Sequence, residues 1–388
     1  MWGPALMQRV YYKYGIEPPA ELNAAVSRVA GGVEADPGQG TVVAYPIDAD
    51  VEFLINATVG NHVLSLDLDT GSSDLWVFSM LQSSVQRTNR HDVYDPVGSN
   101  AKLLEQHSWR IRYGDDSQAT GVVYLDTVTI GGLSVKNQAV GAARDVTASF
   151  TKDKHNDGLL GLGFSKLNSI KPVPQKTWFD NVKPQLAAPL FTCTLKRGAE
   201  GSYDFGYIDQ KKIKGEVIWQ NVAGTRGFWD VAPSGFSFAN GPVNNNKYPG
   251  IIDTGTSLWI MPKEFVDRYW SQVKGATYLD AIHAYIFPCG PGIANPPDIT
   301  TWFGNRKVTI PGINMNYQKL KFSGDPTKRK NNPFQRQAGP DGLMCYGGLQ
   351  NLPNMKINIY GDIFLKGVMA IFEAAPGKQA RLGLAEQS

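Results

Sequence analysis

The stretch Leu66–Phe78, LDLDTGSSDLWVF, places Asp67, Asp69 and Asp74 close together in an otherwise apolar run. Carboxylates gather in this way to bind calcium, to form a turn or to carry out acid–base chemistry. A second copy of the pattern helps to decide between these uses. Residues 252–260 read IDTGTSLWI and repeat residues 68–77, LDTGSSDLWV, with one residue missing.

The two copies lie about half a chain apart, and a second pair of short motifs supports the repeat. Each copy is followed at a similar distance by two apolar residues and a glycine, at residues 159–161 and 359–361. Asp69 aligns with Asp253, whereas the other two aspartates of the first copy have no acidic counterpart. The repeat therefore singles out Asp69 and Asp253 as the pair that carries chemistry.

An aspartate followed by Thr-Gly after an apolar strand sits where the glycine allows the backbone to turn sharply. A pseudo-twofold axis between two such loops brings the two carboxylates face to face. Two carboxylates so close cannot both ionise readily, so the pair shares a proton. The ionised member can take a proton from water, and the protonated member can donate one to a carbonyl oxygen. This chemistry adds water to an amide without a metal or a covalent intermediate.

The composition is that of a folded chain of about two domains. Its 388 residues are 42% hydrophobic, and a net charge of +3 gives no reason to expect nucleic acid as a partner. No run is long enough for a transmembrane helix. Short alternating runs, such as residues 51–59 and 63–68 on either side of Gly60, predict an all-β fold. The clearest helical pattern covers residues 264–274.

Three segments follow from these patterns. Residues 1–40 are expected to hold one or two short helices and a linker. Residues 41–225 and 226–388 are expected to form two β domains, each with one copy of the repeat.

On these paired motifs, residues 40–388 resemble the pepsin family (A1) of aspartic endopeptidases, and its fungal members most closely. The resemblance implies two β-rich lobes, related by a pseudo-twofold axis, around a deep cleft that binds a peptide or protein substrate. Asp69 and Asp253 match the catalytic dyad. Six neighbours match the family's supporting residues, namely the interlocking Thr70 and Thr254, the glycines Gly71 and Gly255, and the carboxylate-binding hydroxyls Ser72 and Thr256.

The resemblance also implies a flap, a hairpin that closes over substrate. Its residues are Tyr113, Gly114 and Asp115, with Trp76 as the hydrogen-bond donor to the tyrosine. The expected substrate pocket includes three residues, Asp67, Phe150 and Leu159.

Two positions depart from the family pattern. Asp116 replaces a second flap glycine, which is expected to stiffen the tip and to add charge. Asn156 replaces a pocket phenylalanine and makes that pocket more polar. In fungal relatives an aspartate at the Asp115 position is associated with accepting lysine before the scissile bond, so basic residues are expected to be tolerated there.

Residues 11–16, YYKYGI, resemble the end of the family's inhibitory propeptide. In that interpretation Lys13, beside Tyr14, lies against both aspartates and keeps the enzyme latent at neutral pH. Protonation of the carboxylates at low pH weakens its hold. The alternative is a solvated lysine on a short helix.

The remaining features carry less information. Cys289 and Cys345 match the family's disulfide, Cys193 is expected to be a buried thiol, and Asn56 lies in a glycosylation sequon inside a predicted strand. No cofactor or metal is expected, because the histidines show no ligand spacing.

No signal peptide is visible, and a secreted or vacuolar monomer is the expectation. Two alternatives stay open: a binding protein on this fold, or acid–base chemistry other than proteolysis.

Overall fold

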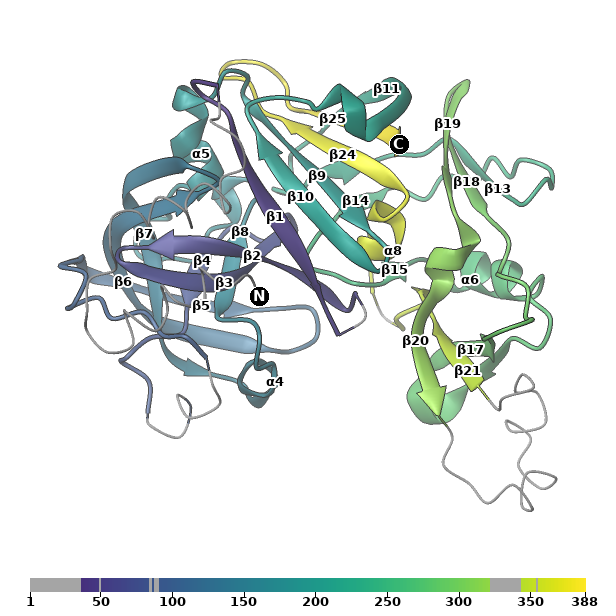
Figure 1. Ribbon diagram of the computed structural model, residues 1–388, viewed down its shortest axis with the longest axis horizontal. Helices are drawn as coiled ribbons and strands as arrows, with labels where there is room; N and C mark the ends of the chain where they lie inside the picture. Colours follow the sequence, from purple (N-terminus) through teal and green to yellow (C-terminus); the bar gives the residue numbers. More distant parts are fainter. Residues whose placement is uncertain (1–35, 49, 84–85, 87–90, 322–342, 354) are drawn as a thin grey trace.

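The computed structural model describes residues 36–48, 50–83, 86, 91–321, 343–353 and 355–388. Across these residues the chain is mostly strand, and it forms two lobes joined by a central sheet (Figure 1). The first lobe lies at the left of Figure 1, and the second lobe, drawn in green, lies at the right. This architecture confirms the all-β, bilobed fold that the sequence predicts.

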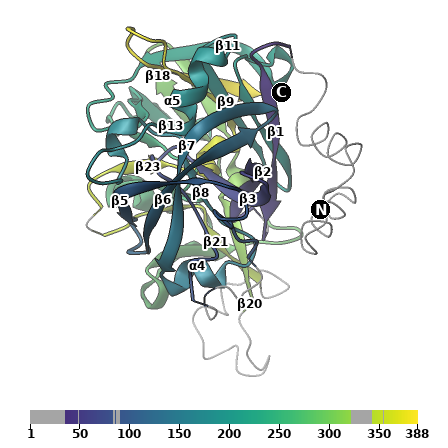
Figure 2. The same cartoon turned by 90° about the vertical axis from the view of Figure 1, so that its left-hand side faces the viewer.

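The first lobe is built mainly from hairpins. β2 and β3 pair antiparallel around Gly60, whose φ of 60° lies in the left-handed region that favours glycine. The long β6 pairs with both β5 and β7, and in Figure 2 this lobe faces the viewer. Its strands are β2 (Glu52–Val59), β3 (His62–Asp69), β4 (Leu75–Val77), β5 (Lys102–Arg112), β6 (Gln118–Ile130), β7 (Leu133–Val146) and β8 (Gly158–Gly161).

A central sheet joins the lobes, with strand order β11-β25-β24-β9-β10-β1. β1 pairs with β10 through residues 40–44 and with β2 through residues 45–47, so one strand belongs to both the central sheet and the first lobe. The strands are β1 (Gly40–Ile47), β9 (Leu190–Lys196), β10 (Ala199–Phe205), β11 (Ile213–Asn221), β24 (Val368–Glu373) and β25 (Arg381–Gln387).

The second lobe holds three smaller sheets, ordered β12-β14-β23-β15-β22, β13-β18-β19 and β16-β17-β21-β20. Their strands are β12 (Asp230–Val231), β13 (Gly235–Phe238), β14 (Gly250–Ile252), β15 (Trp259–Ile260), β16 (Thr277–Leu279), β17 (Ala284–Pro288), β18 (Ile299–Phe303), β19 (Arg306–Ile310), β20 (Asn316–Lys321), β21 (Leu343–Gly347), β22 (Leu349–Gln350) and β23 (Asn358–Tyr360).

Helices are short and lie between the strands. The predicted helix at residues 264–274 corresponds to α6 (Lys263–Trp270), which buries Phe265 and Tyr269 against the second lobe. The others are α4 (Ala148–Lys152), α5 (Trp178–Val182), α8 (Asp362–Leu365) and the 3-10 turns η1 (Ser165–Leu167), η2 (Lys183–Gln185), η3 (Gln210–Lys212), η4 (Asp280–Ile282) and η5 (Gly312–Met315).

One apolar core runs through both lobes and the central sheet. At its centre Phe191 of β9 stacks on Phe372 of β24 with ring centroids 4.5 Å apart, and Trp229 of the second lobe packs edge-on against Phe372. A second cluster in the first lobe contains Trp76 and Trp109, stacked at 5.7 Å. Because the core is shared, the lobes are fixed to one another rather than hinged on a linker.

The same strand pairing recurs in each lobe and explains the two short motifs. β3, which ends at Asp69, pairs parallel with β8 so that Asp69 lies opposite Gly161. β14, which ends one residue before Asp253, pairs parallel with β23 so that Ile252 lies opposite Tyr360. Both candidate aspartates therefore leave the carboxyl end of a buried strand at equivalent places.

Candidate active site

The two Asp-Thr-Gly loops hold each other through an exchange of hydrogen bonds. The backbone N–H of Thr70 donates to Oγ1 of Thr254 at 3.0 Å, and the N–H of Thr254 donates to Oγ1 of Thr70 at 3.1 Å. Each hydroxyl then donates to a backbone carbonyl of the opposite lobe, Thr70 to Ile252 and Thr254 to Leu68. This pseudo-symmetric contact fixes the position of both neighbouring aspartates.

The two carboxylates face each other across this contact. A Cβ placed on Gly71 would lie 2.5 Å from Oδ1 of Asp253, and one placed on Gly255 would lie 2.5 Å from Oδ1 of Asp69. Each aspartate therefore approaches the glycine of the opposite loop so closely that no larger residue fits there. Asp69 and Asp253 are only 4% and 7% exposed.

Hydrogen bonds orient the carboxylates, though not symmetrically. The N–H of Gly71 donates to Oδ1 of Asp69 at 2.7 Å, and the N–H of Gly255 donates to Oδ1 of Asp253 at 3.0 Å. The hydroxyl of Thr256 donates to Oδ2 of Asp253 at 2.8 Å. Ser72, its counterpart, lowers the pKa of Asp69, but among the described residues its buried Oγ has no partner of hydrogen-bond geometry.

Burial and the neighbouring carboxylate set the protonation of the pair. Burial, and after it the negative charge of Asp253, raise the pKa of Asp69 to about 8. The contacts from Ser72 and Gly71 oppose this shift only in part. Consequently the pair retains one proton in acidic and neutral solution, as two facing carboxyls must.

The flap is the hairpin between β5 and β6. Trp76 Nε1 donates to the Tyr113 hydroxyl at 2.8 Å, and Phe150 packs edge-on against both rings. Asp115 is held inside the hairpin, because its Oδ1 accepts from the N–H and the hydroxyl of Ser117 at 3.0 and 2.6 Å. Tyr113 lines the same cavity as the two aspartates.

The unusual flap residue Asp116 adopts a left-handed backbone conformation, with φ of 67°. That region favours glycine, so the aspartate takes the backbone angle that a glycine would adopt more easily. Its carboxylate pairs with Arg112 at 2.6 Å on the exposed face of the hairpin. The extra charge is therefore neutralised locally by this ion pair.

A cavity of about 750 Å³ lies between flap and aspartates. The predicted pocket residues Asp67, Phe150 and Leu159 all line it. Apart from the dyad, its lining includes the acidic residues Glu52, Asp67, Asp74, Asp115 and Asp153 and the apolar residues Phe228, Leu258, Ile260, Leu352, Met355 and Ile359.

The two unrepeated aspartates have separate surroundings. Asp74 accepts hydrogen bonds from the N–H and the hydroxyl of Ser169, so it ties the loop to a neighbouring segment. Burial raises its pKa to about 6. Asp67 is 8% exposed, and burial followed by the charge of Asp69 raises its pKa well above the ordinary value.

Sequence reasoning missed several acidic groups beside the dyad. Glu52 accepts a hydrogen bond from Asn156, and burial followed by the charge of Asp153 raises its pKa to about 8. Asp362, at the start of α8, is 1% exposed, and burial raises its pKa as well. Asp362 directly follows the second apolar-apolar-glycine motif, which is the one signal that could have marked it.

Other expectations fall in different parts of the chain. The structure contains the disulfide between Cys289 and Cys345, and Cys193 is a free, buried thiol. Lys13 and Tyr14 lie outside the described residues. Within the part of the chain that is described, no cluster of three or more potential ligands could hold a metal ion, and no helix is long and apolar enough to cross a membrane.

Comparison with known proteins agrees with this geometry. The family model described as "Eukaryotic aspartyl protease" matches residues 52–387, nearly the whole of the two lobes. The chain belongs to this family, and it is an aspartic endopeptidase that acts on peptide substrates.

Several curated relatives are fungal proteins. Aspergillopepsin-1 of Aspergillus flavus is 42% identical over 385 residues, which cover 99% of this chain and 87% of the relative. The aspartic protease pepA of Leptosphaeria maculans is 40% identical, with 100% and 90% covered, and penicillopepsin-1 of Penicillium rubens is 39% identical, with 99% and 88% covered. These names do not favour the two alternatives, a binding protein or an enzyme of non-proteolytic chemistry.

Proposed function

We propose that Asp69 and Asp253 are the catalytic dyad of an endopeptidase of the EC 3.4.23 type. The observation that carries the proposal is the pair of reciprocal hydrogen bonds between Thr70 and Thr254, called the threonine exchange below. It brings two buried carboxylates face to face inside the cleft. Their shared proton gives the pair both an acid and a base at the same pH.

Hydrolysis follows from this protonation state. A water between the carboxyls loses a proton to the ionised member while its oxygen attacks the peptide carbonyl carbon. The protonated member donates to the carbonyl oxygen, which gives a neutral tetrahedral diol. Transfer of a proton to the amide nitrogen then lets the C–N bond break and releases an amine and a carboxylic acid. No metal or covalent enzyme intermediate takes part in these steps.

The supporting residues have matching roles in this proposal. Thr256 holds the outer oxygen of Asp253, and Ser72 is placed to do the same for Asp69 after a small shift of its hydroxyl. Tyr113 covers the scissile bond while Trp76 orients its ring. Asp67, Phe150 and Leu159 form the pocket next to the flap. Asp115 is partly engaged by Ser117, and its remaining oxygen is the acceptor for a basic side chain of the substrate.

The test replaces each aspartate by its neutral isostere. Asp69→Asn and Asp253→Asn should each reduce cleavage of a denatured protein by at least three orders of magnitude while the melting temperature shows a folded chain. Asp280→Asn, at an exposed aspartate outside the cleft, should leave cleavage unchanged. Activity retained in either dyad variant would refute the assignment.

The latency of the enzyme is part of the same proposal. Lys13 and Tyr14 fill the cleft of a secreted or vacuolar monomer until acid releases them. A shift from pH 7 to pH 4 should shorten the wild-type chain by roughly forty residues, judged by intact mass, and proteolysis should appear at the same time. The Asp253→Asn chain should keep its full mass. A wild-type chain that is active at full length would contradict the latency.

A further inference from the structure

A second cavity, of about 670 Å³, adjoins the cleft. Tyr317 lines both spaces. The chain also connects them directly, because Asp50 lines the second cavity and Glu52, two residues later, lines the cleft. The walls come from the β1–β2 turn, the β9–β10 turn and the part of the second lobe around the disulfide. A polypeptide that leaves the cleft past Tyr317 would enter this space.

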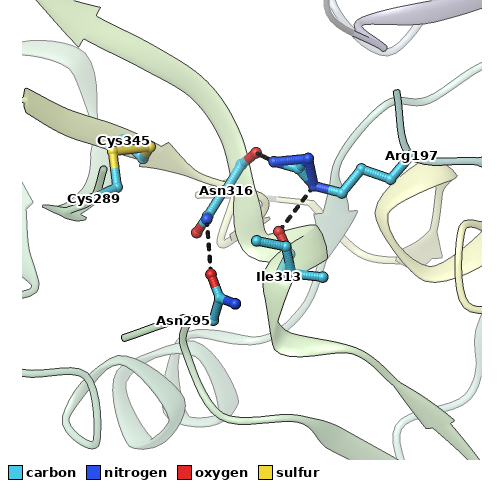
Figure 3. The surroundings of a disulfide bond; sticks show 6 residues. All are labelled: Arg197, Cys289, Asn295, Ile313, Asn316 and Cys345. Carbon is cyan, nitrogen blue, oxygen red and sulfur yellow. Dashed lines mark hydrogen bonds between the residues drawn. A yellow bond between two sulfur atoms is a disulfide. The ribbon is translucent and has the colours of Figure 1, made fainter. Parts of the chain in front are cut away.

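The second cavity is cationic, in contrast to the acidic wall of the cleft. Lys366 is buried, pairs with Asp50 at 3.5 Å and is thereby largely neutralised. Arg197 uses its guanidinium on two backbone carbonyls, those of Ile313 and Asn316, at 3.1 and 3.2 Å (Figure 3).

Neither exposed cation of this cavity has an acidic partner in the described part of the chain. No carboxylate there lies within ion-pair distance of Arg197 or of Lys319. Asp48 also lines the cavity, but it is exposed and is not bonded to either cation. Two positive charges without an ion-pair partner among the described residues therefore face this space, against the single free carboxylate of Asp48.

An unpartnered amide lies in the same wall. The side chain of Asn314 is only 4% exposed, and its Nδ2 has no hydrogen-bond partner among the described residues. A buried N–H donor left unpaired costs free energy, so such a donor points to a ligand that accepts from it. The same wall also holds an unpartnered acceptor, Oδ1 of Asn316, so the surplus of donors in the cavity comes from Arg197 and Lys319.

We propose that this cavity binds a carboxylate of the substrate polypeptide, several residues away from the bond that is cut. The inference rests on the proposed proteolytic function and adds a substrate preference to it. Basic residues are accepted in the acidic cleft, and an acidic residue is preferred where the chain passes Tyr317. The cavity thus selects protein substrates by the charge of a segment that does not react.

The experiment compares peptides that share one core, long enough to span the cleft, with an extension at either end. A single Asp, or Asn in its place, is moved through the extension, and kcat/KM is measured at pH 5, where the side chain of Asp is ionised. At one end the Asp peptide should be cleaved roughly threefold to tenfold faster than the Asn peptide, mainly through a lower KM. Salt at 0.5 M should reduce this ratio.

Charge reversal at the cavity identifies the site. Lys319→Glu should bring the Asp-over-Asn ratio to one or below, without changing cleavage of the unextended core. Lys136→Glu makes the same change in net charge on an exposed strand residue outside both cavities, and it should leave the ratio unchanged.

A steric variant tests the same cavity independently of charge. Gly198 borders it with a φ of 65°, and a Cβ there meets no atom within 4 Å. Gly198→Asn is compatible with that backbone and should lower the ratio by narrowing the space. Gly215→Asn, at a φ of 70° with equally open surroundings outside both cavities, is the matched control.

The outcomes separate the two proposals. A ratio of one at every position in the wild-type enzyme, or equal effects of Lys319→Glu and Lys136→Glu, would overturn the cavity's role while cleavage of the core peptide still supports the dyad. Failure of the wild-type enzyme to cleave the core peptide would instead remove the proteolytic proposal itself.

Discussion

At the scale of single residues, the threonine exchange is the contact on which the geometry of the dyad depends. Thr254→Val removes the acceptor for the N–H of Thr70 and the donor to the carbonyl of Leu68. Both groups are buried, so the free energy of unfolding should fall by about 2–4 kcal/mol. Urea denaturation in an Asp253→Asn background, which prevents self-digestion, measures the change.

The control is Thr277→Val, which removes a hydroxyl from a half-buried position in β16, away from both loops. It should change the free energy of unfolding by less than about 1 kcal/mol. Equal effects of the two substitutions would show that the exchange contributes nothing beyond an ordinary hydroxyl.

The flap tyrosine allows a second prediction at this scale. Tyr113→Phe keeps the ring against Phe150 but removes the oxygen that accepts from Trp76. Because the ring is then held less firmly over the cleft, kcat/KM should fall roughly tenfold with little change in melting temperature. Tyr278→Phe, at an exposed tyrosine outside the cleft, should leave the kinetics unchanged. An unaltered kcat/KM in Tyr113→Phe would contradict a positioning role for the hydroxyl.

The sequence indicated some residues of the site better than others, for a physical reason. Asp69 and Asp253 could be predicted because the repeat places both in the same local pattern. The difference between Ser72 and Thr256 could not, because one methyl group and a small shift of a hydroxyl decide which one reaches a carboxylate. The buried Glu52 was missed, because its burial is created by segments far away in the chain.

At the scale of elements, the disulfide closes a long loop of the second lobe. Cys289 and Cys345 are 56 residues apart, and they join β21 to the segment that follows β17. The double substitution Cys289→Ser and Cys345→Ser should lower the free energy of unfolding by about 2–4 kcal/mol, since the unfolded chain regains the freedom that the bond removed. Calorimetry in the Asp253→Asn background measures this loss. The control Cys193→Ser changes a buried free thiol and leaves the disulfide intact. A reductant should therefore destabilise Cys193→Ser, which still has a disulfide to lose, but not the double variant.

Strand hairpins and the helix at α6 were predictable, because their signals are local: a glycine turn between alternating runs, and apolar residues at helical spacing. The double membership of β1 was not predictable. The sequence patterns name no strand at residues 40–47, and only the pairing with β10 and β2 shows that these residues form a strand that connects the central sheet with the first lobe.

At the scale of the whole molecule, buried acids predict how stability depends on pH. The pKa of Glu52 is raised to about 8 in the folded protein, and that of Asp362 is raised as well, whereas both are near 4 in an unfolded chain. The folded state therefore binds more protons between pH 4 and pH 8. This stabilisation is fully present below about pH 4 and is lost as the pH rises through the folded pKa.

The expected result is a melting temperature that falls from pH 4 to pH 8, corresponding to a loss on the order of 3 kcal/mol. Measured in the Asp253→Asn background, Glu52→Gln should make this dependence shallower, because the amide binds no proton and only the share of Asp362 is left. Glu216→Gln, at an exposed glutamate, should not. A stability that rises across this interval would show that the buried carboxyls are ionised in the folded protein.

Two lobes around a cleft could be predicted from the repeat, since equivalent sequences form equivalent structures. The boundary proposed between residues 225 and 226 stays a prediction. After the second lobe is complete, β24 and β25 return to the central sheet, so the chain is not divided into two separate halves at one position. The second cavity could not be predicted, since its walls come from three separate parts of the chain that only the folded arrangement brings together.

The threonine exchange also bears on how such a molecule arose. Each loop completes its hydrogen bonds only with the loop of the other lobe, so a single lobe would leave a backbone N–H and a hydroxyl without partners. A half-length ancestor with one Asp-Thr-Gly loop could satisfy these groups only by associating with a second identical copy. Duplication and fusion of the gene would then have made the pairing permanent, and from that moment the two halves were free to diverge. The two copies now differ by one extra residue in the first and by the hydroxyls at Ser72 and Thr256, and neither difference breaks the contact between the loops.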